Sequence, residues 1–169
     1  MSKMSFSKKH SMVKVALLLL TMILSTSFAN AKKAKVTETR YDIEGVETGV
    51  QGTYMVKVYI YTSKPEATTD QIKYAAVHGV LFRGFSGKGF ATQKALARPE
   101  IETQKADFFN AFWENGDYQA YANIVNAVAD RLKMSSKEYK IGAVVSVSKD
   151  SLRKLLEDAG IIKGLNSGF

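Results

Sequence analysis

The sequence predicts an α+β domain, a two-layer sandwich in which helices cover one face of a mostly antiparallel sheet of about four strands. Three observations support this fold class. Segments with alternating apolar residues come in neighbouring pairs with short connections, which suits antiparallel hairpins better than crossover units. Helical patterns separate the two pairs and follow the second, so the expected order is β-β-α-α-β-β-α. Hydrophobic residues make up 46% of the 169 residues, a fraction typical of one globular domain.

Ahead of this domain, the first 31 residues have the order of a secretory signal. An apolar run over 15–24 follows four lysines and is too short to span a bilayer comfortably, which takes roughly 20 residues. The tripeptide Ala29-Asn30-Ala31 has the small residues of a cleavage site. We expect cleavage after Ala31, one α+β domain over 32–169, and a periplasmic or secreted protein with no stable membrane span. The alternative is an uncleaved anchor. The four lysines are Lys3, Lys8, Lys9 and Lys14.

The formal net charge of +8 is concentrated near the N-terminus. Seven of the 24 Lys and Arg precede Val36, and the remaining 17 are matched by 16 Asp and Glu. The body of the domain is therefore nearly neutral, and we expect no nucleic-acid partner. The absence of Cys excludes a disulfide framework, a thiolate metal site, a Cys nucleophile and a lipid-anchored N-terminal Cys.

The first predicted strand pair covers residues 36–44 and 53–61, with a glycine-rich turn over 45–52. The second strand has the clearer pattern, because it alternates and is rich in β-branched and aromatic residues. Lys64-Pro65 ends it. One face of this strand carries Tyr54, Val56, Val58 and Ile60, and the other carries Met55, Lys57, Tyr59 and Tyr61.

A helix is predicted to begin after Thr68. Thr68 and Gln71 have the spacing of a capping box, in which each side chain satisfies a free backbone amide at the helix start. Small residues on the apolar stripe of this helix, Gly79 among them, allow it to lie close to the sheet.

A long glycine-containing loop is expected over 84–98, and a second helix begins at Pro99, where the first helical turn accepts proline. Asn115-Gly116 ends this helix. Its aromatic residues are expected in the core: Phe108, Phe109, Phe112 and Trp113.

Residues 118–134 fit a helix and a strand equally well. We predict a strand followed by an irregular turn, because the next strand, over 139–147, needs a partner. Ser148 is placed to cap a last helix over 149–159, which Gly160 ends. Leu152, Leu155 and Leu156 form its apolar face.

The residues offer little support for catalysis or metal binding. His78 is the one histidine after the signal segment, and without Cys no histidine-rich or thiolate zinc site fits within one chain. Ser86 lies in a near miss to the G-x-S-x-G elbow, but Lys88 replaces the second glycine and a helix precedes it. We therefore expect His78 to pack against Tyr74 and Leu81 and to form hydrogen bonds. We expect no enzyme activity, no cofactor and no metal.

Two groups of residues are candidate binding sites. The first is the glycine-rich loop, where cations and glycines are able to form an anion-binding nest and exposed phenylalanines favour a partner. It contains Arg83, Gly84, Phe85, Gly87, Lys88 and Phe90. The second is the pair Tyr59 and Tyr61, which lie on the sheet face opposite the apolar row. Tyrosines on an open sheet face bind sugars or proteins.

Three segments of the sequence carry a resemblance to a known family. The segments AVHGVLFRGF (Ala76 to Phe85), LEDAGIIKGLNSGF (Leu156 to Phe169) and YKIGAVVSVSKDSLRKLLEDAG resemble a family of uncharacterised exported proteins of Gram-negative bacteria. The resemblance covers most of the mature chain. It implies a strand at Tyr118 to Asn126, and it implies no activity and no functional residue.

We therefore expect an exported, non-enzymatic binding or assembly module of the bacterial envelope with an unidentified protein partner. The candidate contact surfaces are the glycine-rich loop and the C-terminal tail, Ile161 to Phe169. The alternative is an exported carbohydrate- or small-ligand-binding protein that uses the aromatic sheet face at Tyr59 and Tyr61.

Overall fold

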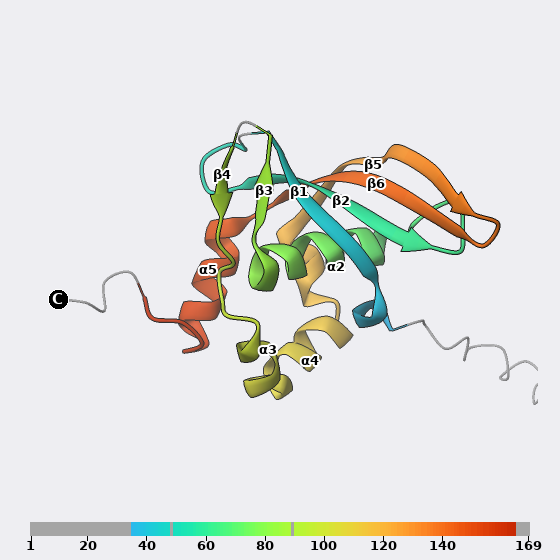
Figure 1. Cartoon of the computed structure of the whole chain (residues 1–169). Coiled ribbons are helices and arrows are strands. Elements are labelled where there is room, and N and C mark those ends of the chain that lie inside the picture. Colours follow the sequence, from blue (N-terminus) through green and yellow to red (C-terminus); the bar gives the residue numbers. More distant parts are fainter. Residues whose placement is uncertain (1–34, 48, 89, 165–169) are drawn as a thin grey trace, which may run out of the picture. The chain divides into compact units, whose positions relative to one another are not determined.

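A computed structural model describes residues 35–47, 49–88 and 90–164, so the predicted signal segment and its cleavage site lie outside the described residues. Four strands form an antiparallel sheet in the order β1-β2-β6-β5, shown in Figure 1. This arrangement confirms the predicted α+β class and the mostly antiparallel four-stranded sheet. The strands are β1 (Arg40–Glu47), β2 (Tyr54–Thr62), β5 (Ala122–Ser135) and β6 (Glu138–Val147).

The helical elements surround a central helix, α2 (Thr69–His78), which continues into the π-helical turn η2 (Gly79–Arg83). The others are the 3₁₀ turns η1 (Val36–Glu38) and η3 (Asp117–Tyr121), with the helices α3 (Glu100–Gln104), α4 (Ala106–Glu114) and α5 (Lys149–Asp158). Within the described ranges, every helix is too short or too polar to reach across a bilayer.

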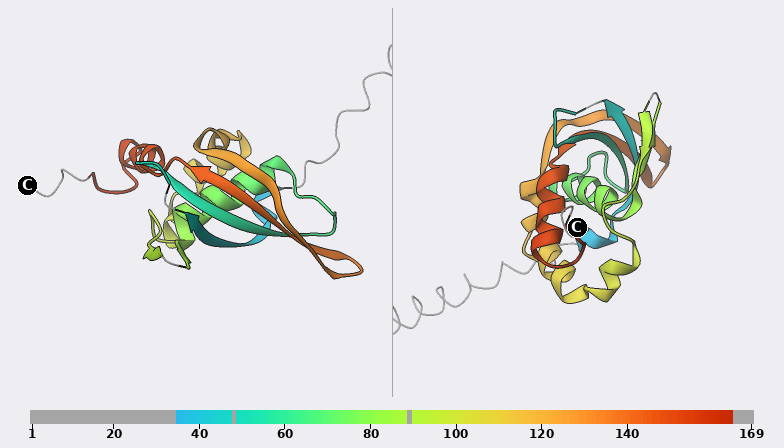
Figure 2. Two further views of the ribbon diagram at one scale, coloured as in Figure 1. Left: turned by 90° about the horizontal axis from the view of Figure 1, so that it is seen from above. Right: turned by 90° about the vertical axis from the view of Figure 1, so that its left-hand side faces the viewer.

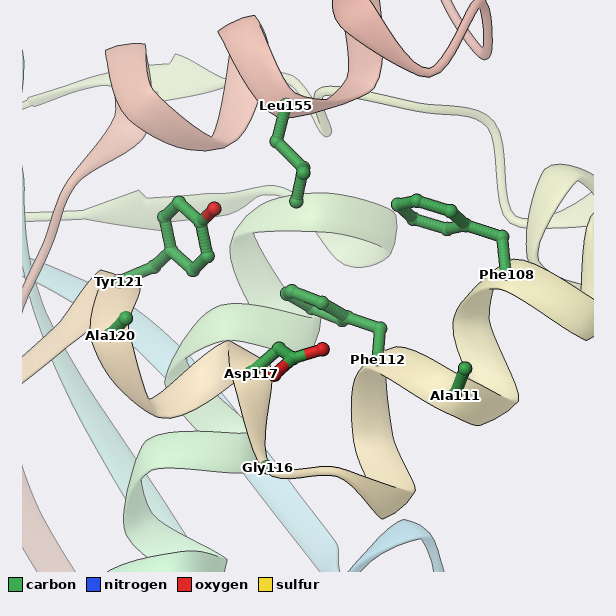
Figure 3. Close-up of a pocket in the computed structure, with 8 residues that line it drawn as sticks. All are labelled: Phe108, Ala111, Phe112, Gly116, Asp117, Ala120, Tyr121 and Leu155. Atoms are coloured by element: carbon green, nitrogen blue, oxygen red, sulfur yellow. The ribbon is translucent and has the colours of Figure 1, made fainter.

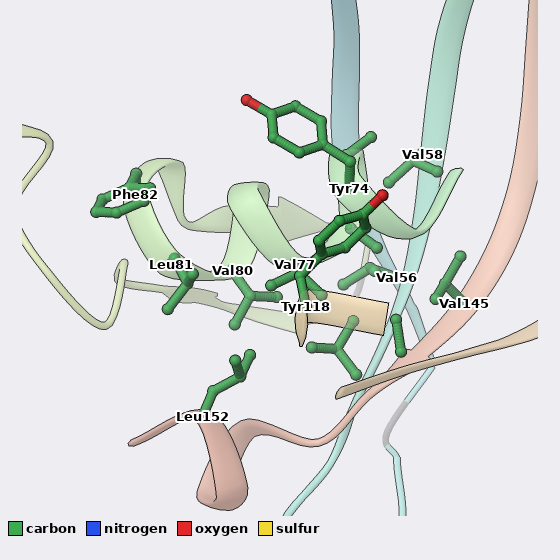
Figure 4. Packing of buried hydrophobic residues seen from close by; sticks show 14 of the residues in the cluster. Val56, Val58, Tyr74, Val77, Val80, Leu81, Phe82, Tyr118, Val145 and Leu152 are labelled. Carbon is green, nitrogen blue, oxygen red and sulfur yellow. The ribbon is translucent and has the colours of Figure 1, made fainter. Parts of the chain in front are cut away.

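The core lies between the sheet and α2. Figure 2 shows α2 lying along one face of the sheet. From Val56 to Ile60, the alternating residues of β2 that face α2 are fully buried, as are those of β6 from Ile141 to Val147, because each strand places every second side chain on that face. Figure 4 shows several of these side chains meeting Val77, Val80 and Leu152. The fully buried strand residues are Val56, Val58, Ile60, Ile141, Ala143, Val145 and Val147.

The start and the packing of α2 follow the predicted pattern. Thr68 Oγ1 accepts a hydrogen bond from the Gln71 amide, and the Gln71 side chain accepts one from the Thr68 amide, so the capping box forms. At Gly79 a Cβ atom would lie 2.5 Å from Ile43 Cδ1. Glycine at this position therefore lets the helical segment approach β1 closely.

The segment over 84–98 was expected to be one long loop. It contains a short antiparallel hairpin instead. Its strands are β3 (Phe85–Gly87) and β4 (Phe90–Gln93). Gly84 has a φ of +68°, which favours glycine, and a Cβ at Gly87 would overlap the carbonyl oxygen of Gly45 in β1. These glycines therefore allow the hairpin to pack against the edge of the sheet.

Three other boundaries differ from the prediction. The strand predicted over 36–44 begins only at Arg40 and runs to Glu47, because Val36–Glu38 form the 3₁₀ turn η1. The helix predicted from Pro99 breaks at Lys105, whose φ of −115° and ψ of 38° are not helical, so α3 and α4 are separate. Within 118–134, the preference for a strand is confirmed, but the strand begins at Ala122 after the η3 turn and runs to Ser135. The predicted irregular turn is instead strand with register shifts, which absorb the extra residues of β5.

Candidate functional site

An apolar groove lies between α4, η3 and α5, as Figure 3 shows. Its volume is about 580 Å³. Aromatic and aliphatic side chains form most of its wall, and one carboxylate, Asp117, joins them. The lining residues are Phe108, Ala111, Phe112, Gly116, Asp117, Ala120, Tyr121 and Leu155.

The local sequence of α4 builds one wall of the groove. Phe108, Ala111 and Phe112 have the i, i+3, i+4 spacing that places side chains on one side of a helix. The rings of Phe108 and Phe112 are stacked, with their centroids 6.2 Å apart. Phe112 is buried, whereas Phe108 is half-buried, so the Phe108 ring presents apolar surface to the groove.

A turn after α4 builds the second wall. Gly116 has a φ of +80°, a left-handed conformation that ends the helix and turns the chain into η3. The Tyr121 ring then lies 5.9 Å from the Phe112 ring. Leu155 of α5 closes the third side, and Figure 3 shows it directed toward the rings. Two consecutive elements, α4 and η3, and the distant helix α5 therefore supply the groove.

The rim of the groove is acidic on the α4 side. Asp107 and Glu114 are exposed and lie at i−4 and i+3 from Ala111, so they share its stripe of the helix. Among the described residues, neither of them nor Asp117 has an ion-pair partner. On α5, by contrast, Arg153 pairs with Glu157 and Lys154 pairs with Asp158. The rim therefore offers negative charge that the described residues do not neutralise.

The candidate residues of the glycine-rich loop are not brought together into one site. The Arg83 guanidinium donates to the Tyr41 carbonyl oxygen at 2.8 Å and lies 4.1 Å from the centre of the Tyr41 ring, so it is engaged with β1. Lys88 is exposed. Gly84 and Gly87 serve the close packing described above, which explains these glycines without an anion.

Phe85 is buried, so the expectation that it is exposed is wrong. Its ring packs edge-on against Tyr54, with the centroids 5.0 Å apart, because the hairpin folds back on the sheet. Phe90 belongs to β4, and its side chain lies outside the described part. Ile161 and Ile162 of the C-terminal tail pack against the core, and residues 165–169 lie outside the described ranges.

Tyr59 and Tyr61 lie on the sheet face away from α2, as expected from their alternation with the buried row. Both are already engaged. The Tyr59 hydroxyl donates to Glu44 at 2.7 Å, and the Tyr61 hydroxyl donates to Asp42 at 2.6 Å. Lys140 Nζ lies 4.4 Å from the centre of the Tyr59 ring.

Charged neighbours complete this sheet face. The Arg40 guanidinium lies 4.3 Å from the centre of the Tyr61 ring. The hydrogen bond from Tyr61 and the nearby Lys140 ammonium hold the pKa of Asp42 below its ordinary value, despite some burial. The tyrosine rings are therefore part of a network of ion pairs and cation–π contacts, which leaves less of their surface for a sugar.

Polar groups do converge around His78. Its Nδ1 lies 2.6 Å from the Tyr41 hydroxyl, and its Nε2 lies 3.2 Å from Glu102 Oε2. The Trp113 indole donates to Glu102 Oε1 at 3.1 Å. Every member thus bonds another member of the cluster. His78 packs against Tyr74 as expected, with ring centroids 5.1 Å apart.

The polar groups of this cluster satisfy one another by hydrogen bonds within the protein. Burial alone would raise the pKa of Glu102, but the hydrogen bonds from His78 and Trp113 outweigh it and lower the pKa. Burial raises the pKa of Tyr41 far above its ordinary value. His78 is not among the residues that line the groove. Within the described ranges, no group of three or more His, Cys, Asp or Glu is arranged to hold a metal ion.

The sequence matches no family model, and searches among curated proteins and solved structures give no match. The resemblance to exported proteins of Gram-negative bacteria therefore stays a prediction.

Sequence reasoning missed the groove because it assigned all four aromatic residues of α4 to the core. Three of them, Phe109, Phe112 and Trp113, are buried, but Phe108 is not. The available signal was the number of apolar stripes. Residues 108 and 112 form one stripe and 109 and 113 form another, which is more apolar surface than a short helix buries against one layer.

Proposed function

We propose that this chain is an exported, non-enzymatic binding module of the bacterial envelope, and that its α4–η3–α5 groove holds an apolar side chain of a protein partner. The observation that carries the proposal is the half-buried Phe108 ring in the wall of a mostly apolar groove, which Phe112, Tyr121 and Leu155 also line. Apolar surface of this kind, rimmed by polar groups, is typical of interaction sites. The export step rests on the order of the first 31 residues.

The acidic rim specifies the chemistry of the partner. Asp107, Glu114 and Asp117 flank the hollow without a cation of their own among the described residues. A partner segment with a large apolar residue next to Lys or Arg complements both features, because its apolar side chain fills the hollow while its cation meets the rim. An amphipathic segment is a common ligand for such grooves.

Two features support binding over catalysis and over sugar recognition. The hydrogen-bonding atoms of Tyr41, His78 and Glu102 are directed to one another, so the cluster has the character of a structural network. The rings of Tyr59 and Tyr61 have cations above them and carboxylates at their hydroxyls. The carbohydrate-binding alternative therefore receives less support than the groove.

Site-specific photo-crosslinking in the native host tests the proposal. A photoreactive residue is placed at Ala111, in the groove, and for comparison at Thr92, which is exposed on β4. We expect one defined protein adduct from position 111 and none from position 92. The crosslinked peptide, once mapped and synthesised, should bind the purified protein, and Phe108→Asp should abolish both the adduct and the binding.

Equal adducts from the two positions would contradict the proposal, as would a peptide whose affinity is unchanged by Phe108→Asp. Asp107→Lys with Asp117→Lys tests the rim separately. If the double variant binds the mapped peptide as tightly as the parent protein, the groove can still be the site but its partner is not cationic.

A further inference from the structure

The β5–β6 hairpin ends in a projecting segment, residues 131–140, which we name the hairpin tip. Figures 1 and 2 show the hairpin extending past the end of α2. Because no helix formed by the described residues covers this part of the sheet, side chains on both of its faces are accessible. The exposed fractions of Leu132 and Met134 are 57% and 50%.

Exposed aliphatic side chains are concentrated on this hairpin. Four of the six large hydrophobic residues that are exposed in the described part of the chain lie in β5: Val125, Val128, Leu132 and Met134. Leu132 and Met134 are two residues apart in β5, and a register shift against β6 falls between Lys133 and Ser135, at Met134. The concentration on one strand distinguishes this surface from the isolated apolar residues that are normal on proteins.

The hairpin tip is also cationic. Residues 131–140 contain four Lys or Arg and one Glu. Arg131 lies 3.5 Å from Glu66, and Lys140 lies 3.5 Å from Asp42. The one acid of the tip, Glu138, pairs with Arg40.

Two lysines of the hairpin tip, Lys133 and Lys137, are left without a carboxylate partner among the described residues. Lys64 is exposed in the loop after β2, which lies beside the tip because Thr62 pairs with Tyr139. Uncompensated cations and exposed aliphatic residues therefore occur together at this end of the sheet.

We propose that the hairpin tip attaches this protein to the surface of an anionic phospholipid bilayer. Burial of aliphatic side chains at the boundary of the acyl chains lowers the free energy, and neighbouring ammonium groups bind the phosphates of the headgroups. Long lysine side chains reach from one zone to the other. The Tyr139 ring, which has Lys133 Nζ 6.0 Å from its centre, belongs to the residue type that favours the interface.

Other occupants fit the hairpin tip less well. Nucleic acid would meet the lysines but leave Leu132 and Met134 in water. A second copy could pair antiparallel with β5 about a twofold axis at residue 131, 132 or 133. Each of these registers sets Arg131 or Lys133 opposite a like charge, which destabilises strand pairing. The combination of cations and aliphatic residues thus favours a lipid surface.

Cosedimentation with vesicles tests this proposal, using the protein recovered after export. The vesicles contain phosphatidylethanolamine and phosphatidylglycerol at a ratio of three to one, with neutral phosphatidylcholine vesicles as the reference. We expect partition to the anionic vesicles that weakens with added salt. Because each lysine near an anionic surface contributes a factor of about five, Lys133→Glu with Lys137→Glu should weaken partition at least about 25-fold.

Matched controls separate the hairpin tip from general charge and hydrophobicity. Lys94→Glu with Lys163→Glu makes the same charge change at exposed positions outside the tip, and Val50→Ser is the counterpart of Leu132→Ser with Met134→Ser. We expect the tip variants to lose partition and the controls to keep it. In addition, Leu132→Trp should show a blue-shifted emission on the anionic vesicles, and Val50→Trp should not.

No partition to the anionic vesicles, or equal losses in tip and control variants, would overturn the proposal. It would also be overturned if the lysine variants lost binding to a nucleic-acid duplex while vesicle binding was absent. The groove variant Phe108→Asp should leave partition unchanged, so this result is independent of the function proposed for the groove.

Discussion

The Tyr41 hydroxyl lies 2.6 Å from Nδ1 of His78 and connects the first strand to the central helix. Both ring nitrogens of His78 are satisfied when Tyr41 donates to Nδ1 and Nε2 donates to Glu102. Glu102 belongs to α3 and also accepts from Trp113 of α4. One network thus connects four elements that are separated along the chain.

Removal of the Tyr41 hydroxyl should destabilise the protein. Tyr41→Phe keeps the buried ring but leaves Nδ1 of His78 without its partner, and an unsatisfied buried polar group costs about 1–3 kcal/mol. Urea unfolding measures this loss in the free energy of unfolding. Tyr61→Phe is the matched control, because its hydroxyl bonds Asp42 at an exposed position and should change stability little. Equal losses in the two variants would show that the network adds no stability beyond a surface contact.

The free energy of unfolding should depend on pH partly through Glu102. Hydrogen bonds lower its folded-state pKa below the ordinary value of 4.5, despite burial. A carboxyl whose pKa is lowered on folding stabilises the protein above its unfolded-state pKa, and this contribution is lost as the pH falls through the folded-state pKa. Glu102→Gln should therefore show a smaller decline in stability than the parent on acidification below about pH 4.5. Urea unfolding at a series of pH values measures the slope.

The control for this pH dependence is Glu114→Gln, which alters an exposed carboxylate of α4 without an ion-pair partner among the described residues. Its slope should match that of the parent protein. A parental slope in Glu102→Gln would mean that other carboxylates, Asp42 among them, account for the acid sensitivity.

Adjacent phenylalanines of α4 should respond differently to truncation. Phe109 is buried, with 1% of its surface exposed, so Phe109→Ala should lower the free energy of unfolding by about 3–5 kcal/mol. Phe108 is half-buried at the groove, so Phe108→Ala should cost less than about 2 kcal/mol. Thermal or urea unfolding of the two variants makes the comparison. A similar large loss from Phe108→Ala would assign its ring to the core and remove the basis for a binding groove.

The sequence was most informative where a local pattern has one physical reading. Alternation identified β2 and β6, the Thr68 and Gln71 pair identified the start of α2, and Gly79 indicated close packing. The β3–β4 hairpin was missed because strands of three and four residues have no periodicity to detect. The break at Lys105 was missed because nothing in the local sequence opposes a continuous helix.

The functional features depend on distant contacts and were therefore less accessible. Tyr41 and Glu102 lie 37 and 24 residues from His78, so their convergence follows only from the packing of β1 and α3 around α2. Likewise, the groove requires α5 to lie beside α4 and η3. Phe85 illustrates the opposite error, because a glycine-rich neighbourhood predicted exposure and the hairpin buries the ring.

The π-helical turn at Gly79–Arg83 indicates how the chain length of this segment is accommodated. The Gly84 amide bonds the Gly79 carbonyl oxygen at 2.9 Å, which places one residue more in this turn than an α-helix has. Deletion of a single residue here would restore regular helical phase and turn the following side chains by about 100°. Arg83 would then leave the Tyr41 ring and carbonyl, so the extra residue is what brings a cation from the end of the helix to the edge of the sheet.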